Sequence, residues 1–391
     1  MGGTGRQPCP DVNATQVLIH SPEFILASAI RANKKLRGNR RGSLEDCLAL
    51  PDILKLGQAL GEEVAVWPVP KKSGGFRAIC SFGLQHRTRQ ELVCSMLGVL
   101  YKPRPWQFTH KGVPKAIAAI KSRIGSQSLH VASLDIENCF PSFDHKLVNE
   151  LPLPSEVVEH VALGRHMAVV AKQGTNAGAA RLPISLSTDA LLLGARRGIP
   201  LGSTCSPIVA SFVLARLTWI LSVVAAAVNY VDDFFLMAPS ASALKDQIGE
   251  LGKAVSDLPG GTFNLRTLRS GPIDEGAEFL GHHFQMIEGH LITSPTQRNH
   301  DRFWKRCCMF DTKLPKVHTA ATRTIARTIL AAQWSFAKHW FEAFSACDRI
   351  GEMETGWSLL FEETAEYHGL TLAQIKPYLT PYYGEDEGYV A

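Results

Sequence analysis

The chain has 391 residues, of which 45% are hydrophobic and 20% charged, so it is long enough for a large core and two or three subdomains. Its nine cysteines include no Cys-x-x-Cys pair, which argues against a structural zinc site or a disulfide framework and favours a reducing cytoplasm. The net charge of +5 is a mild excess, compatible with a polyanionic partner. No charged segment followed by an apolar one opens the sequence, so we expect no secretory signal.

The first 60 residues predict a helical extension. Residues 22–32 favour one helix, Ser43 can open the next, and residues 51–60 favour another short helix. Residues 34–41 hold a basic tract that fits either a phosphate backbone or an exposed, solvated loop.

A basic hairpin follows. Residues 64–69 and 76–81 predict two strands joined by a Lys-Lys-Ser-Gly-Gly turn. Lys71 and Lys72 at the tip and Arg77 on the return strand would suit a triphosphate, because Lys offers a point charge and Arg a planar fork. Most exposed basic hairpins bind nothing in particular, so this pattern alone leaves both interpretations open.

The next buried strand is predicted at residues 129–136 and carries Asp135 near its end. Glu137 would share a face with Asp135 if the strand continued. Ser142 is a good N-cap for a following helix, and residues 151–190 favour further helices.

A glycine-bearing loop then precedes an apolar stretch. Gly202 lets the backbone approach a ligand closely, and Ser206 with Pro207 predicts the N-cap and first residue of a helix with free N–H groups. The apolar stretch, residues 207–228, is about long enough to span a bilayer. Arg216 near its middle and the lack of flanking basic clusters instead favour a buried helix that runs into a strand.

Two carboxylates interrupt an apolar run at Tyr230-Val231-Asp232-Asp233. This pattern predicts two buried strands and a tight turn with Asp232 and Asp233 at the tip. Adjacent carboxylates repel, and their burial is costly unless a cation or hydrogen bonds compensate. Mg2+ takes oxygen ligands of this kind, although a plain Asp-Asp hairpin turn is the commoner explanation of such a pattern taken alone.

The remaining third predicts mixed and then helical structure. We expect a helix at residues 242–258, a short basic strand at 264–269 and a hairpin within residues 279–293. Trp334 and Trp340 lie in a later helix and are expected in its core. An earlier helix carries cations on successive turns, namely Arg298, Arg302, Lys305 and Arg306.

The order of these segments resembles the reverse transcriptases, particularly the bacterial enzymes related to those of group II introns, retrons and phage defence. The segments similar to the fingertips, the three palm motifs and the primer-grip hairpin are residues 71–77, 133–145, 197–207, 230–233 and 278–284. Each motif is weakly specific by itself, and their conjunction in one order, across roughly residues 60–295, carries the resemblance.

This resemblance implies an α+β fold arranged as a right-hand polymerase, with an antiparallel palm sheet packed on helices and a helical thumb. It assigns an N-terminal helical extension to residues 1–60, the fingers to residues 61–130 and 150–197, the palm to residues 131–149 and 198–294, and the thumb and C-terminal tail to residues 295–391.

The resemblance also implies a metal site. Asp135 and Asp232 would be the ligands of two Mg2+ ions, which Mn2+ can replace, and Asp233 would be the supporting carboxylate. Such a pair of ions activates a primer 3'-hydroxyl and steadies the leaving pyrophosphate. The implied nucleotide-binding residues are Lys71, Lys72, Arg77, Phe140, Gly202 and Tyr230, and the implied contacts to the primer–template duplex are Arg302, Lys305 and Arg306.

Two of these positions carry specific expectations, and others depart from the family pattern. Phe140 occupies the steric-gate position, where a bulky ring crowds a ribose 2'-hydroxyl, and Gly202 would lie under the nucleotide and template base. Leu201 stands where the family commonly has Gln, which leaves templated fidelity in question. On the later palm strand the family usually has a Lys that can protonate pyrophosphate, whereas this chain has Arg266 and Arg269 there. Because Arg hardly titrates, these residues would supply charge rather than a proton.

The implied function is RNA-directed DNA polymerisation on a dedicated non-coding RNA, in a compact enzyme without endonuclease or RNase H regions, with phage defence as one role. The implied partners are an RNA template, a DNA or RNA primer and dNTPs; no membrane is expected and oligomerisation is left open. The alternatives are template-independent, protein-primed or RNA-producing synthesis, and a non-catalytic RNA-binding scaffold.

Overall fold

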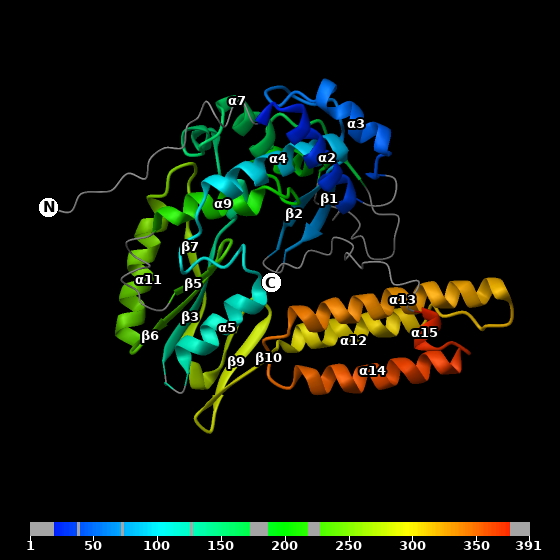
Figure 1. Cartoon of the computed structure of the whole chain (residues 1–391). Coiled ribbons are helices and arrows are strands. Elements are labelled where there is room, and N and C mark those ends of the chain that lie inside the picture. Colours follow the sequence, from blue (N-terminus) through cyan, green and yellow to red (C-terminus); the bar gives the residue numbers. More distant parts are fainter. Residues whose placement is uncertain are drawn as a thin grey trace. The chain divides into compact units, whose positions relative to one another are not determined.

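The chain forms two compact units, described here from a computed structural model. The first comprises residues 1–109, 136–225 and 248–266, and the second residues 110–135, 226–247 and 267–391. The residues that the structure describes are 19–36, 40–71, 74–125, 127, 129–172, 187–217 and 227–375. Helices and sheets occur in both units (Figure 1), which confirms the predicted α+β class. The assignment of fingers, palm and thumb stays a prediction.

Unit 1 is built around a small sheet of three strands in the order β2-β1-β4. Its helices and strands are α2 (Pro22–Lys35), α3 (Leu44–Ile53), β1 (Val64–Pro70), β2 (Phe76–Ser81), α4 (Leu84–Leu100), α6 (Cys139–Ser142), α7 (Ser155–Val157), β4 (Val169–Ala171), α8 (Thr188–Arg196) and α9 (Ser206–Leu214). Short 3-10 helices follow at His145–Asn149 and Ala215–Leu217, and a π-helical turn at Val158–Ala162. Helix α8 packs on this sheet, where Val64, Val66, Phe82 and Leu191 are fully buried.

The prediction that residues 151–190 are helical is correct at residues 155–162 and from Thr188, and residues 173–186 lie outside the described residues. It is wrong at Val169–Ala171, which form strand β4. This strand pairs in parallel with β1, Val64 opposite Val169, and the Val64 N–H donates to the Ala168 carbonyl at 2.8 Å. β-branched residues favour such a pleated, half-buried position. The pairing joins segments about a hundred residues apart, so no local sequence pattern predicts it.

The N-terminal helices begin where predicted but end differently. Ser21 caps α2, and Ser43 with Asp46 forms a capping box at the start of α3. The helix predicted at residues 51–60 is wrong, because α3 runs through Pro51 and ends at Ile53. The segment beyond it is held by Arg89 of α4, which is 1% exposed and donates to the carbonyls of Leu56 and Gln58.

Unit 2 contains most of a four-stranded sheet in the order β5-β6-β3-β7, and a second sheet in the order β10-β9-β8. The elements that build or adjoin these sheets are α5 (Val113–Ile124), β3 (His130–Ile136), β5 (Ala227–Tyr230), β6 (Asp233–Ala238), α11 (Ala241–Ser256), β7 (Leu265–Pro272), β8 (Ala277–Phe279), β9 (His282–Ile287) and β10 (His290–Pro295). Helix α5 packs against β5, and its Arg123 donates to the Ala227 carbonyl at 2.6 Å.

Four helices complete unit 2: α12 (Gln297–Asp311), α13 (Ala320–Ala343), α14 (Ile350–Tyr367) and α15 (Leu372–Ile375). Their core is aromatic, with Phe303 and Trp340 buried and their ring centroids 4.4 Å apart. The prediction that Trp334 and Trp340 are core residues is confirmed, since Trp334 packs against the same cluster.

Within the described ranges, no helix is both long and apolar enough to cross a bilayer. The apolar stretch from Pro207 is helical as far as Leu217 and resumes as strand β5 at Ala227. This agrees with a helix that runs toward a strand, and residues 218–226 between them lie outside the described residues.

Candidate active site

The β5–β6 hairpin presents the two adjacent carboxylates. Tyr230 pairs with Asp233, so only Val231 and Asp232 form the connecting loop. The predicted pair of buried strands with a tight turn is therefore confirmed, although Asp233 opens strand β6 rather than lying at the tip. Phe234 and Phe235, which follow, are fully buried and anchor the hairpin in the unit.

Sheet register brings the distant third carboxylate to this hairpin. Asp135 on β3 lies directly opposite Asp233 on β6, as Tyr230 does from the other side. Directly opposed residues on antiparallel strands share a face with their Cβ atoms about 4.5–5.5 Å apart. Asp135, Asp232 and Asp233 are all half-buried.

The loop is conformationally unusual. Val231 has φ +55°, a left-handed value that costs a β-branched residue about 1–3 kcal/mol. Glycine is the residue usually found where such a two-residue loop needs positive φ. The fully buried Asn229 side chain donates to the Val231 carbonyl at 2.9 Å and to the Asp233 carbonyl at 3.1 Å.

These carboxylates fit Mg2+ by their chemistry. Hard oxygen ligands suit this ion, which usually takes one or two protein carboxylates and completes its shell with water and substrate phosphates. Among the described residues no group of three or more His, Cys, Asp or Glu side chains is placed to hold a metal ion. The division of roles between Asp232 as ligand and Asp233 as helper stays a prediction.

Tyr230 lies beside the carboxylates on the same row of the sheet. Its side chain is half-buried, and this burial raises the pKa of its hydroxyl above the usual value. The hydroxyl is therefore neutral across the physiological range and does not compete with the carboxylates as an anion.

Unit 1 holds the predicted triphosphate contacts on a different kind of hairpin. Lys71 opens the turn between β1 and β2, where its carbonyl accepts from the Gly74 N–H at 3.2 Å. The Lys71 ammonium donates to the Asn138 side chain at 2.7 Å. In the sequence, Asn138 follows shortly after strand β3, which carries Asp135. Arg77 lies half-buried on β2, opposite Val69. Lys72 lies outside the described residues.

The glycine loop packs on backbone rather than standing open. Gly202 has φ +94°, and a Cβ there would lie 2.2 Å from the Cys80 carbonyl oxygen of β2. The neighbouring Leu201 carbonyl accepts from the Cys80 N–H at 2.8 Å. Close approach of two chain segments therefore explains this glycine, and its predicted place under a nucleotide stays a prediction.

Two predicted helix caps are wrong. Helix α9 begins at Ser206 with Cys205 at the N-cap, because the Ser206 hydroxyl donates to the Pro200 carbonyl instead of capping. Ser142 closes the short helix α6 rather than opening the next one. Asp144 takes that role and accepts from the Lys146 N–H at 2.8 Å.

Phe140 and the basic strand residues are also placed in the structure. Phe140 lies in helix α6, half-buried, and its carbonyl accepts from the Ile199 N–H at 3.0 Å. Arg266 forms an ion pair with Glu137 at 3.5 Å, and Arg269 donates to the Glu275 carbonyl at 2.9 Å. Both arginines are exposed, as residues that supply charge would be.

Exposed cations follow one face of helix α12. Arg298, Arg302 and Lys305 recur at helical spacing and are exposed, whereas Phe303 between them is buried. Partial desolvation lowers the pKa of Arg298, and the nearby charge of Arg302 lowers it further. Arg306 lies with its guanidinium 5.4 Å from the centre of the Phe310 ring.

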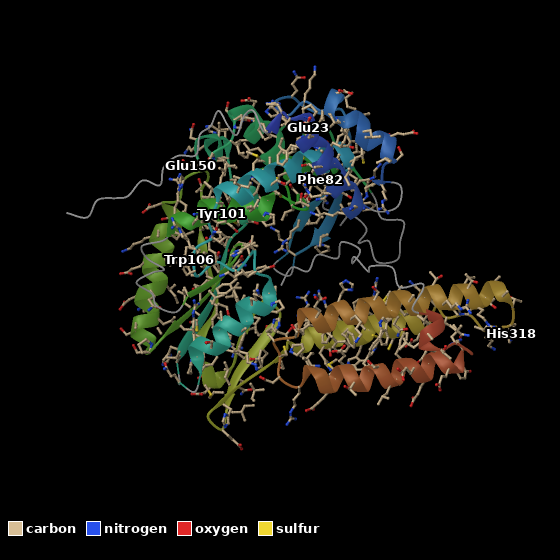
Figure 2. The ribbon with its side chains drawn as sticks, in the orientation of Figure 1. Glu23, Phe82, Tyr101, Trp106, Glu150 and His318 are labelled. Carbon is tan, nitrogen blue, oxygen red and sulfur yellow. The ribbon has the colours of Figure 1, made fainter. Side chains whose placement is uncertain are left out.

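A groove of about 440 Å³ lies beside the start of helix α13 in the same unit. His318 marks this end of the helices, where α12 turns back into α13 (Figure 2). The groove is basic, because two arginines and no acidic residue are among the described residues that line it. Its lining residues are Val317, His318, Thr319, Ala320, Arg323, Thr324 and Arg327.

Sequence reasoning missed two residues at these sites, Asn229 and Asn138. Asn229 is polar within an apolar strand, and that mismatch was the available signal. Asn138 has φ +49°, a left-handed conformation that asparagine tolerates better than most residues. Its side-chain oxygen accepts a hydrogen bond from the Lys71 ammonium.

No protein-family model matches the chain, and neither does any curated protein. Similar solved structures include telomerase from Candida albicans in complex with a TWJ fragment of telomeric RNA (13% identity, TM-score 0.37, 83% of this chain and 61% of that one). They also include apo telomerase from Candida tropicalis (12%, 0.38, 82% and 64%) and the Sicinivirus 3Dpol RNA-dependent RNA polymerase (10%, 0.35, 79% and 64%). The chain spans less than two thirds of the length of these three structures. All three TM-scores lie below 0.5.

Proposed function

We propose that this protein is a nucleotide polymerase of the reverse-transcriptase kind, which adds deoxynucleotides to a primer on an RNA template. One observation carries the proposal: sheet register sets Asp135 opposite Asp233, one residue from Asp232 in a two-residue loop. Asp135 and Asp233 on neighbouring strands, with Asp232 in the adjoining loop, are carboxylates of the kind that a phosphoryl-transfer site uses to hold divalent cations.

The chemistry needs little beyond charge and position. Mg2+ bound by Asp135 and Asp232 would activate the primer hydroxyl and neutralise charge on the leaving pyrophosphate. Lys71 and Arg77 would bind the triphosphate oxygens, Lys as a point charge and Arg as a two-pronged donor. Phe140 would exclude a ribose 2'-hydroxyl and so select deoxynucleotides.

The partners follow from the same assignment. The exposed cations of α12 and the basic groove beside α13 would bind the phosphate backbone of the primer and template. A dedicated non-coding RNA as template and a role in phage defence extend this proposal. Both extensions require that the synthesised DNA match one RNA of the native host, which sequencing of the product determines.

Untemplated synthesis is the second candidate. It is favoured by Leu201, because an apolar side chain stands where the related enzymes commonly have a hydrogen-bonding Gln. Products of random or homopolymeric sequence would support this candidate, whereas DNA complementary to a supplied RNA would support reverse transcription.

The deciding experiment measures dNTP incorporation by the purified full chain with Mg2+ on an RNA template with a DNA primer. Asp232→Ala with Asp233→Ala should abolish incorporation, because the site then loses two of its three carboxylates. Incorporation equal to that of the unchanged protein would refute the site and leave a non-catalytic RNA-binding role.

A further inference from the structure

We infer that Asn229 is a positioning residue, which holds the Val231–Asp232 loop in the conformation that metal binding requires. The inference rests on the proposed function and adds a residue that no motif of the sequence assigns. It concerns one hairpin within unit 2 and a side chain on the face opposite the carboxylates.

The geometry begins with strand alternation. Asn229 pairs with Phe234 and is fully buried, whereas its neighbour Tyr230 pairs with Asp233 on the opposite, half-buried face. From the buried face the Asn229 amide donates to the carbonyls of Val231 and Asp233 at 2.9 and 3.1 Å. These two carbonyls bracket Asp232, so one side chain fixes the backbone on both sides of the predicted metal ligand.

The orientation of the amide is determined by its partners. Both are carbonyl oxygens, which only accept hydrogen bonds, so the NH2 end of Asn229 must face them. The Asn229 Oδ1 is then buried, with no hydrogen-bond partner among the described residues. A buried, unsatisfied oxygen is costly, and an apolar side chain would avoid that cost. Packing alone therefore does not account for an amide at this position.

The loop needs support of this kind. Val231 is held at φ +55°, where a β-branched side chain is disfavoured. The hydrogen bond from Asn229 to the Val231 carbonyl acts on the same residue. Asn229 and Val231 should therefore be energetically coupled, because the amide stabilises a conformation that glycine would adopt without strain.

The test compares substitutions in the full chain. Asn229→Ala removes both hydrogen bonds, and Asn229→Ser, which keeps one short donor, is the substitute if the alanine variant does not fold. Ser133→Ala is the matched control, since Ser133 is buried in the same sheet and donates to the Glu278 carbonyl away from the loop. Val231→Gly, alone and combined with Asn229→Ala, tests the coupling.

Four quantities are measured: kcat and KM for dNTP, the melting temperature, and the affinity for Mn2+, whose binding is followed by its electron paramagnetic resonance signal. Asn229→Ala should lower kcat by about tenfold to a hundredfold with little change in KM, because a small displacement of a reacting group has effects of this size. It should also weaken Mn2+ binding by about tenfold, the change that 1.4 kcal/mol produces. Ser133→Ala should lower the melting temperature about as much as Asn229→Ala does, but it should change neither kcat nor the affinity for Mn2+.

Val231→Gly should restore part of the kcat and Mn2+ affinity lost in Asn229→Ala. The inference is overturned if Asn229→Ala behaves like Ser133→Ala, or if the losses are the same in the Val231→Gly background. Either result leaves the proposed function standing as long as the Asp232 and Asp233 double substitution abolishes incorporation. If that double substitution has no effect, the proposed function itself fails.

Discussion

Two hairpins of this molecule carry opposite charges and are built in opposite ways. The β5–β6 hairpin of unit 2 turns through two residues, and its strands are buried up to Tyr230 and from Phe234 onward. The β1–β2 hairpin of unit 1 turns through Lys71 to Gly75, and its outer end from Val69 is exposed. The acidic hairpin is thus held by buried strands, whereas the basic one carries the half-buried Lys71 at its exposed outer end.

This difference indicates what each hairpin can contribute. The Cβ atoms of Asp135 and Asp233 are placed by strand register, so their separation is set by the sheet. The Lys71 ammonium ends a side chain with four rotatable bonds and donates to an exposed asparagine. Carboxylates placed by strand register suit a site where geometry determines the reaction rate. A flexible cation such as Lys71 suits a site where charge determines ligand binding.

The units also share a feature, a buried histidine, which yields the largest expected effect outside the carboxylates. Burial lowers the pKa of His86 in unit 1 to about 4, aided by the nearby Arg89. Burial likewise lowers the pKa of His282 in unit 2 to about 4, against the effect of its bond to the Leu280 carbonyl. The unfolded chain therefore takes up these protons at higher pH, near 6.5, than the folded chain.

Stability should then be highest above pH 6.5 and fall as the pH drops toward 4, by up to about 3 kcal/mol per histidine. Chemical denaturation at a series of pH values measures this. His282→Gln should flatten the pH dependence of unfolding, whereas His290→Gln at an exposed position of the same hairpin should leave it unchanged. Equal pH profiles for the unchanged protein and His282→Gln would contradict the assignment.

Strands and turns with local signals were predictable from the sequence. Strand β2 has the predicted bounds, and strand β1 differs by one residue at its end, because alternating apolar residues and a glycine turn define them. The carboxylate hairpin was predictable for the same reason: two charges in an apolar run leave a turn as the favourable arrangement.

Features that depend on distant partners were not predictable. Strand β4 exists because residues near Val169 pair with β1, and the segment after α3 is irregular because Arg89 donates to its carbonyls. The register that sets Asp135 opposite Asp233 likewise spans about a hundred residues of chain. For Asn229 the sequence shows only a polar residue in a strand, and its two carbonyl partners appear only once the loop is folded.

The basic hairpin should respond differently from the acidic one. Substitution of Lys71 or Arg77 by Gln should raise KM for dNTP by about tenfold and change kcat little, because uniform binding of the triphosphate is lost. Arg77→Lys should recover part of the affinity, since charge is kept and the planar fork is lost. Steady-state kinetics on one primer–template measure both. A fall in kcat at constant KM would show instead that this hairpin acts on the transition state, as the carboxylates do.

The smallest effect is expected on the α12 face, where charge acts without defined geometry. Arg302→Gln with Lys305→Gln should make the dependence of duplex binding on salt concentration shallower by about two units of logarithmic slope, since two phosphate contacts are lost. Arg323→Gln with Arg327→Gln tests whether the backbone also follows the groove beside α13. Lys245→Gln with Lys253→Gln on the exposed side of α11 removes the same charge elsewhere and is the control. Fluorescence anisotropy across a salt series gives the slopes, and an equal change in all three pairs would show that net charge, not this surface, determines binding.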